Sequence, residues 1–202
     1  MPGSAELAGL LAGPVLEVAP RLLGAVVAHG DVAIRVTEVE AYGGPDGPED
    51  PGSHAARGPT RRNAVMFGPA GRLYVYFTYG LHHCANVVCG PEGTASAVLL
   101  RAGEVVAGIE TARTRRPGAV DRDLARGPAR LCRALGVDLS QDGSDLVVGP
   151  VTLSLGARAL PRAAVSAGPR VGLRLAADRP WRFWETGDPT VSAYRAAVSR
   201  PR

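Results

Sequence analysis

The sequence contains no lysine, and all 23 of its basic side chains are arginine. Without a lysine amine, no side chain can form a Schiff base with a sugar or carbonyl intermediate. Each cation is instead a permanently charged, planar guanidinium whose donors match phosphate oxygens. The formal net charge is only +4, a balance that permits a nucleic-acid partner.

Cysteine and long apolar runs are also scarce. The three cysteines, Cys84, Cys89 and Cys132, are an odd number without a CxxC pair, which argues against a disulfide framework and a zinc cluster. Adjacent His82 and His83 point to opposite faces of a strand and cannot readily ligate one metal together. No apolar run has membrane-spanning length, and no positive charge precedes the weakly apolar N-terminus. We therefore expect a cytoplasmic protein without a signal peptide, a membrane segment or a cofactor.

What is present describes one globular domain. An apolar content of 46% over 202 residues is enough for a core of ordinary size. No repeat or linker divides the chain, so we expect a single α+β domain over 1–202, with a peripheral segment 1–16 and an irregular tail 186–202. Helical patterns cover 4–13, 17–24, 104–115 and 127–136, and strand patterns cover the two sides of a turn at 29–31, then 72–80, 82–90, 96–105, 147–155 and 169–175.

One of these strands carries an acidic residue in apolar surroundings. Side chains alternate along a strand, so Glu40 is expected to share a face with Val36, Glu38 and Tyr42. A carboxylate on a buried face needs a charged or hydrogen-bonded partner, whereas on an exposed face it is simply solvated. The strand runs into a Gly- and Pro-rich loop over 43–60, and loops of this length are commonly functional. The pattern alone leaves both interpretations of Glu40 open.

Aromatic side chains are few, yet four of the ten lie within 74–79, "YVYFTY". We expect Tyr74 and Phe77 to pack in the core, because aromatic rings suit the pleated, half-buried surface of a sheet. Alternation would let the same segment line a pocket with Tyr76 and project Tyr79 from the adjoining turn. From this segment alone, Tyr76 and Tyr79 are expected to pack like their neighbours. Other residues must indicate whether they bind a ligand with aromatic rings.

Six blocks of the sequence occur in a familiar order: "VTEVEAYGGPDGPEDPGSHAA", "RRNAVMFGPAGRLYVYFTYGLHHCANVV", "AVLLRAGE", "LARGPARLCRALG", "GPRVGL" and "PWRFW". Together they resemble the signature blocks of the alkyladenine (3-methyladenine) DNA glycosylase family over roughly residues 18–185. This monofunctional family includes the mammalian methylpurine glycosylase and its bacterial relatives. The resemblance implies a curved antiparallel β-sheet with surrounding helices and a protruding β-hairpin that inserts into DNA.

The resemblance also implies roles for individual residues of these blocks. Glu40 of "EVEAY" matches the general base that activates water, and Arg101 matches an arginine near that glutamate and the target phosphate. Tyr42 and Tyr76 match the two rings that stack on the flipped-out base. His54 matches the histidine that closes the pocket.

Two further positions match residues that contact DNA or select the base. Tyr79 matches the residue that intercalates into the duplex, and Asn86 matches the asparagine that crowds the 2-amino group of guanine. The chain departs from the usual family pattern in two places. An extra stretch at 44–46 lengthens the loop before His54, and Leu-His-His at 81–83 replaces bulkier residues.

The expected activity is excision of alkylated purines of the 3-methyladenine type from double-stranded DNA. Glu40 would activate the attacking water, and an abasic site would remain; the enzyme would act as a monomer at the nucleoid. Extruding a base costs a few kcal/mol, and each aromatic stack can return about 1–3 kcal/mol. Without lysine, the alternative nucleophile is the N-terminal amine, which Pro2 carries if Met1 is removed. Two other classes remain open: a non-catalytic nucleic-acid binder with the same aromatic and arginine surface, and a glycoside hydrolase paired through Glu38 and Glu40.

Overall fold

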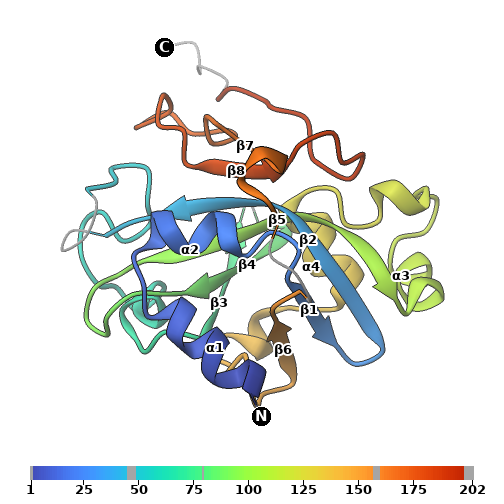
Figure 1. Cartoon of the computed structure of the whole chain (residues 1–202), viewed down its shortest axis with the longest axis horizontal. Coiled ribbons are helices and arrows are strands. Elements are labelled where there is room, and N and C mark those ends of the chain that lie inside the picture. Colours follow the sequence, from blue (N-terminus) through green and yellow to red (C-terminus); the bar gives the residue numbers. More distant parts are fainter. Residues whose placement is uncertain (1, 45–48, 79, 157–159, 198–202) are drawn as a thin grey trace.

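The computed structural model describes residues 2–44, 49–78, 80–156 and 160–197 (Figure 1). Its helices are α1 (Pro2–Leu11), α2 (Val15–Arg21), α3 (Ile109–Arg115) and α4 (Pro128–Leu135). Its strands are β1 (Val26–His29), β2 (Val32–Tyr42), β3 (Leu73–Thr78), β4 (His82–Val88), β5 (Ala97–Ala107), β6 (Val151–Ser154), β7 (Val165–Gly168) and β8 (Arg182–Glu185). None of the helices in these ranges combines the length and apolarity needed to cross a bilayer.

The strands form one curved antiparallel sheet in the order β3-β4-β5-β2-β1-β6. The long strands β2 and β5 pair along most of their length and form its centre (Figure 1). The first half of β2 also pairs with β1, whereas its second half pairs with β8, which in turn pairs with β7. The α+β fold with a curved antiparallel sheet is confirmed.

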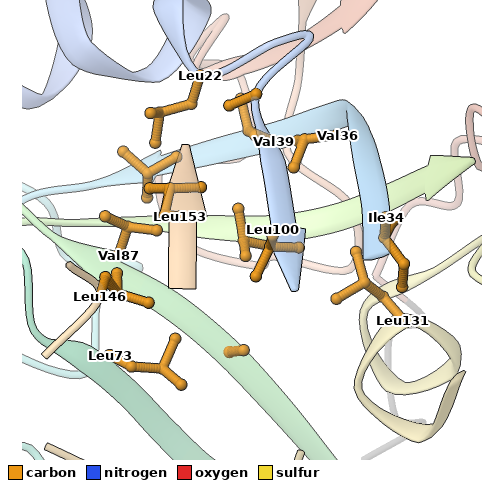
Figure 2. Packing of buried hydrophobic residues seen from close by; sticks show 14 of the residues in the cluster. Leu22, Ile34, Val36, Val39, Leu73, Val87, Leu100, Leu131, Leu146 and Leu153 are labelled. Carbon is orange, nitrogen blue, oxygen red and sulfur yellow. The ribbon is translucent and has the colours of Figure 1, made fainter. Parts of the chain in front are cut away.

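A single large apolar cluster joins the helices to the sheet. Figure 2 shows Leu22, Ile34, Val39 and Leu131 among its members, which come from the end of α2, from β2 and from α4. Full burial of such a side chain contributes about 1.5–3 kcal/mol. Helix α1 belongs to the same core, because its Leu7, Leu10 and Leu11 are buried in it.

Helix α4 illustrates how local sequence signals and packing agree. Pro128 occupies its first turn, where no backbone N–H is needed, and Gly136 follows its end in the left-handed conformation with φ 75°. Leu131 and Leu135 are one helical turn apart and both are buried. The helix expected over 127–136 is thus confirmed.

Two expected elements are wrong, and one strand was not expected. The helix expected over 104–115 begins only at Ile109, because residues up to Ala107 continue β5 and pair with β2. The strand expected over 169–175 is irregular backbone, whereas residues 182–185, for which no strand was expected, form β8 beside β2. At 104–107 and 182–185, backbone pairing offered by a neighbouring strand outweighed local propensity.

The strands expected over 72–80 and 82–90 are present as β3 and β4, which pair as an antiparallel hairpin. Gly80 lies at its turn with φ +65°, a conformation that glycine adopts without strain. Tyr74 is buried as expected, but the core position predicted for Phe77 is wrong, because 42% of Phe77 is exposed and its ring contacts His83. Tyr79, predicted to intercalate into DNA, lies outside the described residues.

Candidate active site

The sheet aligns one row of side chains across five neighbouring strands. Register pairs Tyr74 of β3 with Asn86 of β4, Asn86 with Leu99 of β5, Leu99 with Glu40 of β2, and Glu40 with Arg182 of β8. Directly paired residues project from the same face of a sheet. Strand pairing therefore brings together residues that are up to 142 positions apart, counted from Glu40 to Arg182.

Two irregularities in the β2–β5 ladder decide which face Glu40 occupies. The ladder skips Thr37 on β2 and Arg101 on β5, and each such bulge shifts the alternation of side chains by one residue. Val36 before the bulge and Val39 after it both belong to the apolar core. Glu40 therefore points away from the core, and the prediction that it shares a face with Val36 is wrong.

Glu40 is nevertheless fully buried, with 0% of its surface exposed. Its Oε2 accepts a hydrogen bond from the Tyr42 hydroxyl (2.8 Å), and its Oε1 accepts one from the Val171 backbone N–H (2.7 Å). Nη1 of Arg101 lies 3.3 Å from the same Oε1. The interpretation of Glu40 as a solvated surface residue is therefore wrong, and these partners supply the stabilisation that a buried carboxylate requires.

All three partners of Glu40 line a cavity of about 350 Å³. Rings and apolar groups form most of its wall, together with a few polar groups that can orient a ligand. The lining residues are Tyr42, Gly52, Ser53, His54, Met66, Tyr74, Tyr76, Thr78, His82, Cys84, Asn86, Leu99, Arg101, Pro128, Ala129, Val171, Gly172 and Leu173. The structure thus brings Tyr42, His54, Tyr76, Asn86 and Arg101 together around one space, with Glu40 immediately behind its wall.

The rings of this cavity also contact one another. The His54 ring meets Tyr76 edge-on with 4.5 Å between centroids, and His54 Nδ1 lies 3.3 Å from the Tyr74 hydroxyl. The Arg62 guanidinium lies 5.5 Å from the centre of the Tyr76 ring. Partial burial, and then the charge of Arg62, lower the pKa of His54, so its ring is neutral at pH 7.

Both tyrosines that could stack on a ligand keep their hydroxyl protons. Burial, and then the Glu40 charge, raise the pKa of Tyr42 well above its ordinary value, while burial raises the pKa of Tyr76. Burial alone would lower the pKa of Arg101, but the charges of Glu40 and Glu38 outweigh it and raise it. The site therefore holds two neutral phenols and a fixed cation beside the carboxylate.

Behind Tyr42 lies an ion pair that the sequence did not reveal. Asp50 and Arg170 are fully buried and share two hydrogen bonds of 2.6 Å. The Arg170 guanidinium also donates to the Ala41 carbonyl (2.9 Å) and lies 4.6 Å from the centre of the Tyr42 ring. The pair fixes the ring of Tyr42 from behind and anchors the loop that carries His54. Arg170 lies in the block "GPRVGL", but nothing in that block distinguishes a buried arginine from a surface one.

Glu38, the second carboxylate of the strand, is buried in a separate network. Its two oxygens accept hydrogen bonds from Arg101, Arg182 and Ser192. Protonation of Glu38 would weaken its contacts with two guanidinium groups, so it is unsuited to be the acid of a glycoside hydrolase paired with Glu40.

A second, more open cavity adjoins the first, because His82 and Ala129 line both. Leu81 and His83 of the hairpin line it, and so does Arg133 of α4. Within the described ranges, no group of three or more His, Cys, Asp or Glu side chains is arranged to hold a metal ion.

Comparison with known proteins agrees with this geometry. A Streptomyces avermitilis protein is 58% identical over 198 residues, covering 94% of this chain and 91% of the relative. A Frankia casuarinae protein is 56% identical over 199 residues, covering 94% and 92%; the names of both contain the term 3-methyladenine DNA glycosylase. Residues 10–189 match the methylpurine-DNA glycosylase (MPG) family. The chain therefore belongs to the methylpurine-DNA glycosylase family and, with it, to the hydrolases that act on N-glycosyl bonds.

Proposed function

We propose that the chain is a monofunctional glycosylase of base excision repair that removes alkylated purines of the 3-methyladenine type from double-stranded DNA. The observation that carries this proposal is a buried carboxylate, Glu40, whose three partners form the wall of a ring-lined cavity. Residues 1–202 act as one glycosylase domain and as a monomer at the nucleoid. No cofactor is required.

Recognition begins with extrusion of the damaged nucleotide, because a base inside a duplex exposes only its edges. Tyr42 and Tyr76 line the cavity that receives the extruded base, and so do His54 and Asn86. An aromatic stack contributes about 1–3 kcal/mol per base, which offsets much of the cost of extrusion. Tyr79 fills the vacated space in the duplex.

Hydrolysis follows from the position of Glu40. The carboxylate takes a proton from a water molecule while the water oxygen bonds to C1′ of the sugar. The bond between C1′ and the base nitrogen breaks, and its electron pair leaves with the base. The negative charge of Glu40 also stabilises the oxocarbenium-like transition state. Water is the nucleophile, and the product is an abasic site with an intact strand.

The charge of the substrate explains why a simple site suffices. An alkylated purine such as 3-methyladenine is already cationic, so it departs as a neutral base without protonation. The lowered pKa of His54 fits this scheme, because a neutral imidazole supplies no acid and does not repel a cation. A cationic purine also stacks more strongly on tyrosine faces than a neutral one.

The test compares wild type with Glu40→Gln on duplex DNA treated with a methylating agent, with free base measured by chromatography. We expect wild type to release 3-methyladenine, and we expect the variant to lose at least a hundredfold in rate, the lower range for a general base, while still binding DNA. Loss of DNA binding together with activity would instead indicate a structural role for Glu40. Wild type that binds without releasing base would support a non-catalytic binder. A covalent adduct trapped by borohydride would favour an amine nucleophile.

A further inference from the structure

A second layer of charge lies directly behind Glu40 and is not used in the mechanism above. Glu38 is fully buried, and its Oε1 accepts hydrogen bonds from Nε of Arg101 (3.0 Å) and Nε of Arg182 (2.6 Å). Ser192, from the C-terminal segment, donates to Glu38 twice: its Oγ to Oε1 (2.9 Å) and its backbone N–H to Oε2 (2.7 Å). Four donors from three elements thus converge on one carboxylate.

Arg101 connects this layer to the cavity. Its Nε donates to Glu38, its Nη2 donates to Ser192 Oγ (3.4 Å), and its Nη1 lies 3.3 Å from Glu40 Oε1. The contact with Glu38 is therefore the shorter of its two contacts with carboxylates. Because Arg101 is a bulged residue outside the β2–β5 ladder, its side-chain partners hold it in place.

The charges of the layer balance. Two carboxylates, Glu38 and Glu40, face two guanidinium groups, Arg101 and Arg182. Without the charge of Glu38, Arg101 would keep Glu40 as its carboxylate partner. Arg101 would then move towards Glu40 and shorten its 3.3 Å contact with Oε1, and a closer cation makes the carboxylate a weaker base.

We propose that Glu38 and Ser192 are positioning residues that fix Arg101 and so set its 3.3 Å contact with Glu40, the carboxylate that activates water in the proposed mechanism. This inference rests on the proposed function, because it concerns the hydrolytic step. It assigns a role to the C-terminal segment, which reaches the site through Ser192 and through the bond from Arg182 Nη2 to the Ser192 carbonyl (2.7 Å).

The experiment measures single-turnover release of 3-methyladenine from methylated duplex DNA, with enzyme in excess, and the affinity for the same DNA. For Glu38→Gln we expect a ten- to hundredfold slower rate with affinity changed less than threefold. Glu38→Asp retains the charge. The logarithm of its rate should lie at least a third of the way from the Glu38→Gln value back to the wild-type value. Ser192→Ala retains the backbone N–H donor and should slow the reaction three- to tenfold.

A double-mutant cycle separates positioning from general structural damage. In an Arg101→Gln background, Glu38→Gln and Ser192→Ala should each add less than a threefold loss, because the residue they position is gone. If either change slows the Arg101→Gln enzyme by as large a factor as it slows wild type, the inference is overturned. A Glu38→Gln enzyme as fast as wild type overturns it as well. If Glu38→Gln does not fold, as circular dichroism would show, the Ser192→Ala cycle decides by the same criteria. Absence of base release by wild type overturns the proposed function together with this inference.

Discussion

The ion pair of Asp50 and Arg170 allows a sharp prediction about stability. Asp50→Asn preserves the shape of the side chain but leaves a guanidinium without its counter-ion. Both side chains have 0% exposure, so water cannot replace the lost charge. Within the described part of the chain, Arg170 Nε already has no hydrogen-bond partner, so the hydrogen bonds of the guanidinium go to Asp50 and the Ala41 carbonyl. Breaking a buried pair at one partner costs about 3–5 kcal/mol in the free energy of unfolding.

This cost corresponds to a large change in melting temperature. For a chain of this size each kcal/mol shifts the midpoint by about 2–4 °C, so we expect Asp50→Asn to melt roughly 6–20 °C below wild type. Thermal unfolding by circular dichroism measures the shift. The matched control is Glu110→Gln, which removes a partner of the exposed Arg113 and should leave the midpoint unchanged, because surface ion pairs contribute little. A midpoint for Asp50→Asn within 2 °C of the control would refute the argument.

Three further predictions concern recognition and pH. In a Glu40→Gln background, Tyr76→Leu should reduce the preference for methylated over undamaged duplex by about 5- to 150-fold, which is the equivalent of one lost stack. Tyr76→Phe keeps the ring and should change the preference less than threefold. Competition binding measures both ratios. Arg133→Gln, beside the second cavity, should reduce the slope of log affinity against log salt by about 0.9, whereas Arg113→Gln should leave the slope unchanged, as titrations at several salt concentrations will show. The pKa of His54 is lower in the folded chain than its unfolded value of about 6.5, so the free energy of unfolding decreases as pH falls below that value. His54→Gln should reduce this decrease, which urea unfolding between pH 7.5 and 5 measures.

The sequence predicted those parts of the fold whose signals are local. The turn at 29–31 and the helix at 127–136 depend on glycine and proline at defined positions, and the structure confirms both. Residues 104–107 were assigned to a helix and the strand at 182–185 was not predicted, because the state of both segments depends on strands distant in the sequence. A local pattern carries no information about whether a neighbouring strand offers free N–H and C=O groups.

The candidate site was also predicted only in part. The resemblance to a family identified Glu40 and the rings around the cavity, but alternation along the strand placed Glu40 on the wrong face. Paired bulges at Thr37 and Arg101 reverse the alternation, and both residues look ordinary in a strand sequence. Val171 donates to Glu40 through its backbone N–H, so the identity of its side chain gave no signal.

The absence of lysine has a structural counterpart in the buried layers of the site. Arg101 contacts three acceptors, two on β2 and one in the C-terminal segment, through three different nitrogens. Arg170 contacts both oxygens of Asp50 and a carbonyl while its guanidinium lies over the Tyr42 ring. A lysine ammonium is a single point of charge without a planar face, so it could not hold two carboxylates apart or support a ring. Whatever the origin of the arginine bias across the whole chain, the geometry at these two positions requires a guanidinium, because one rigid group must set several distances at once.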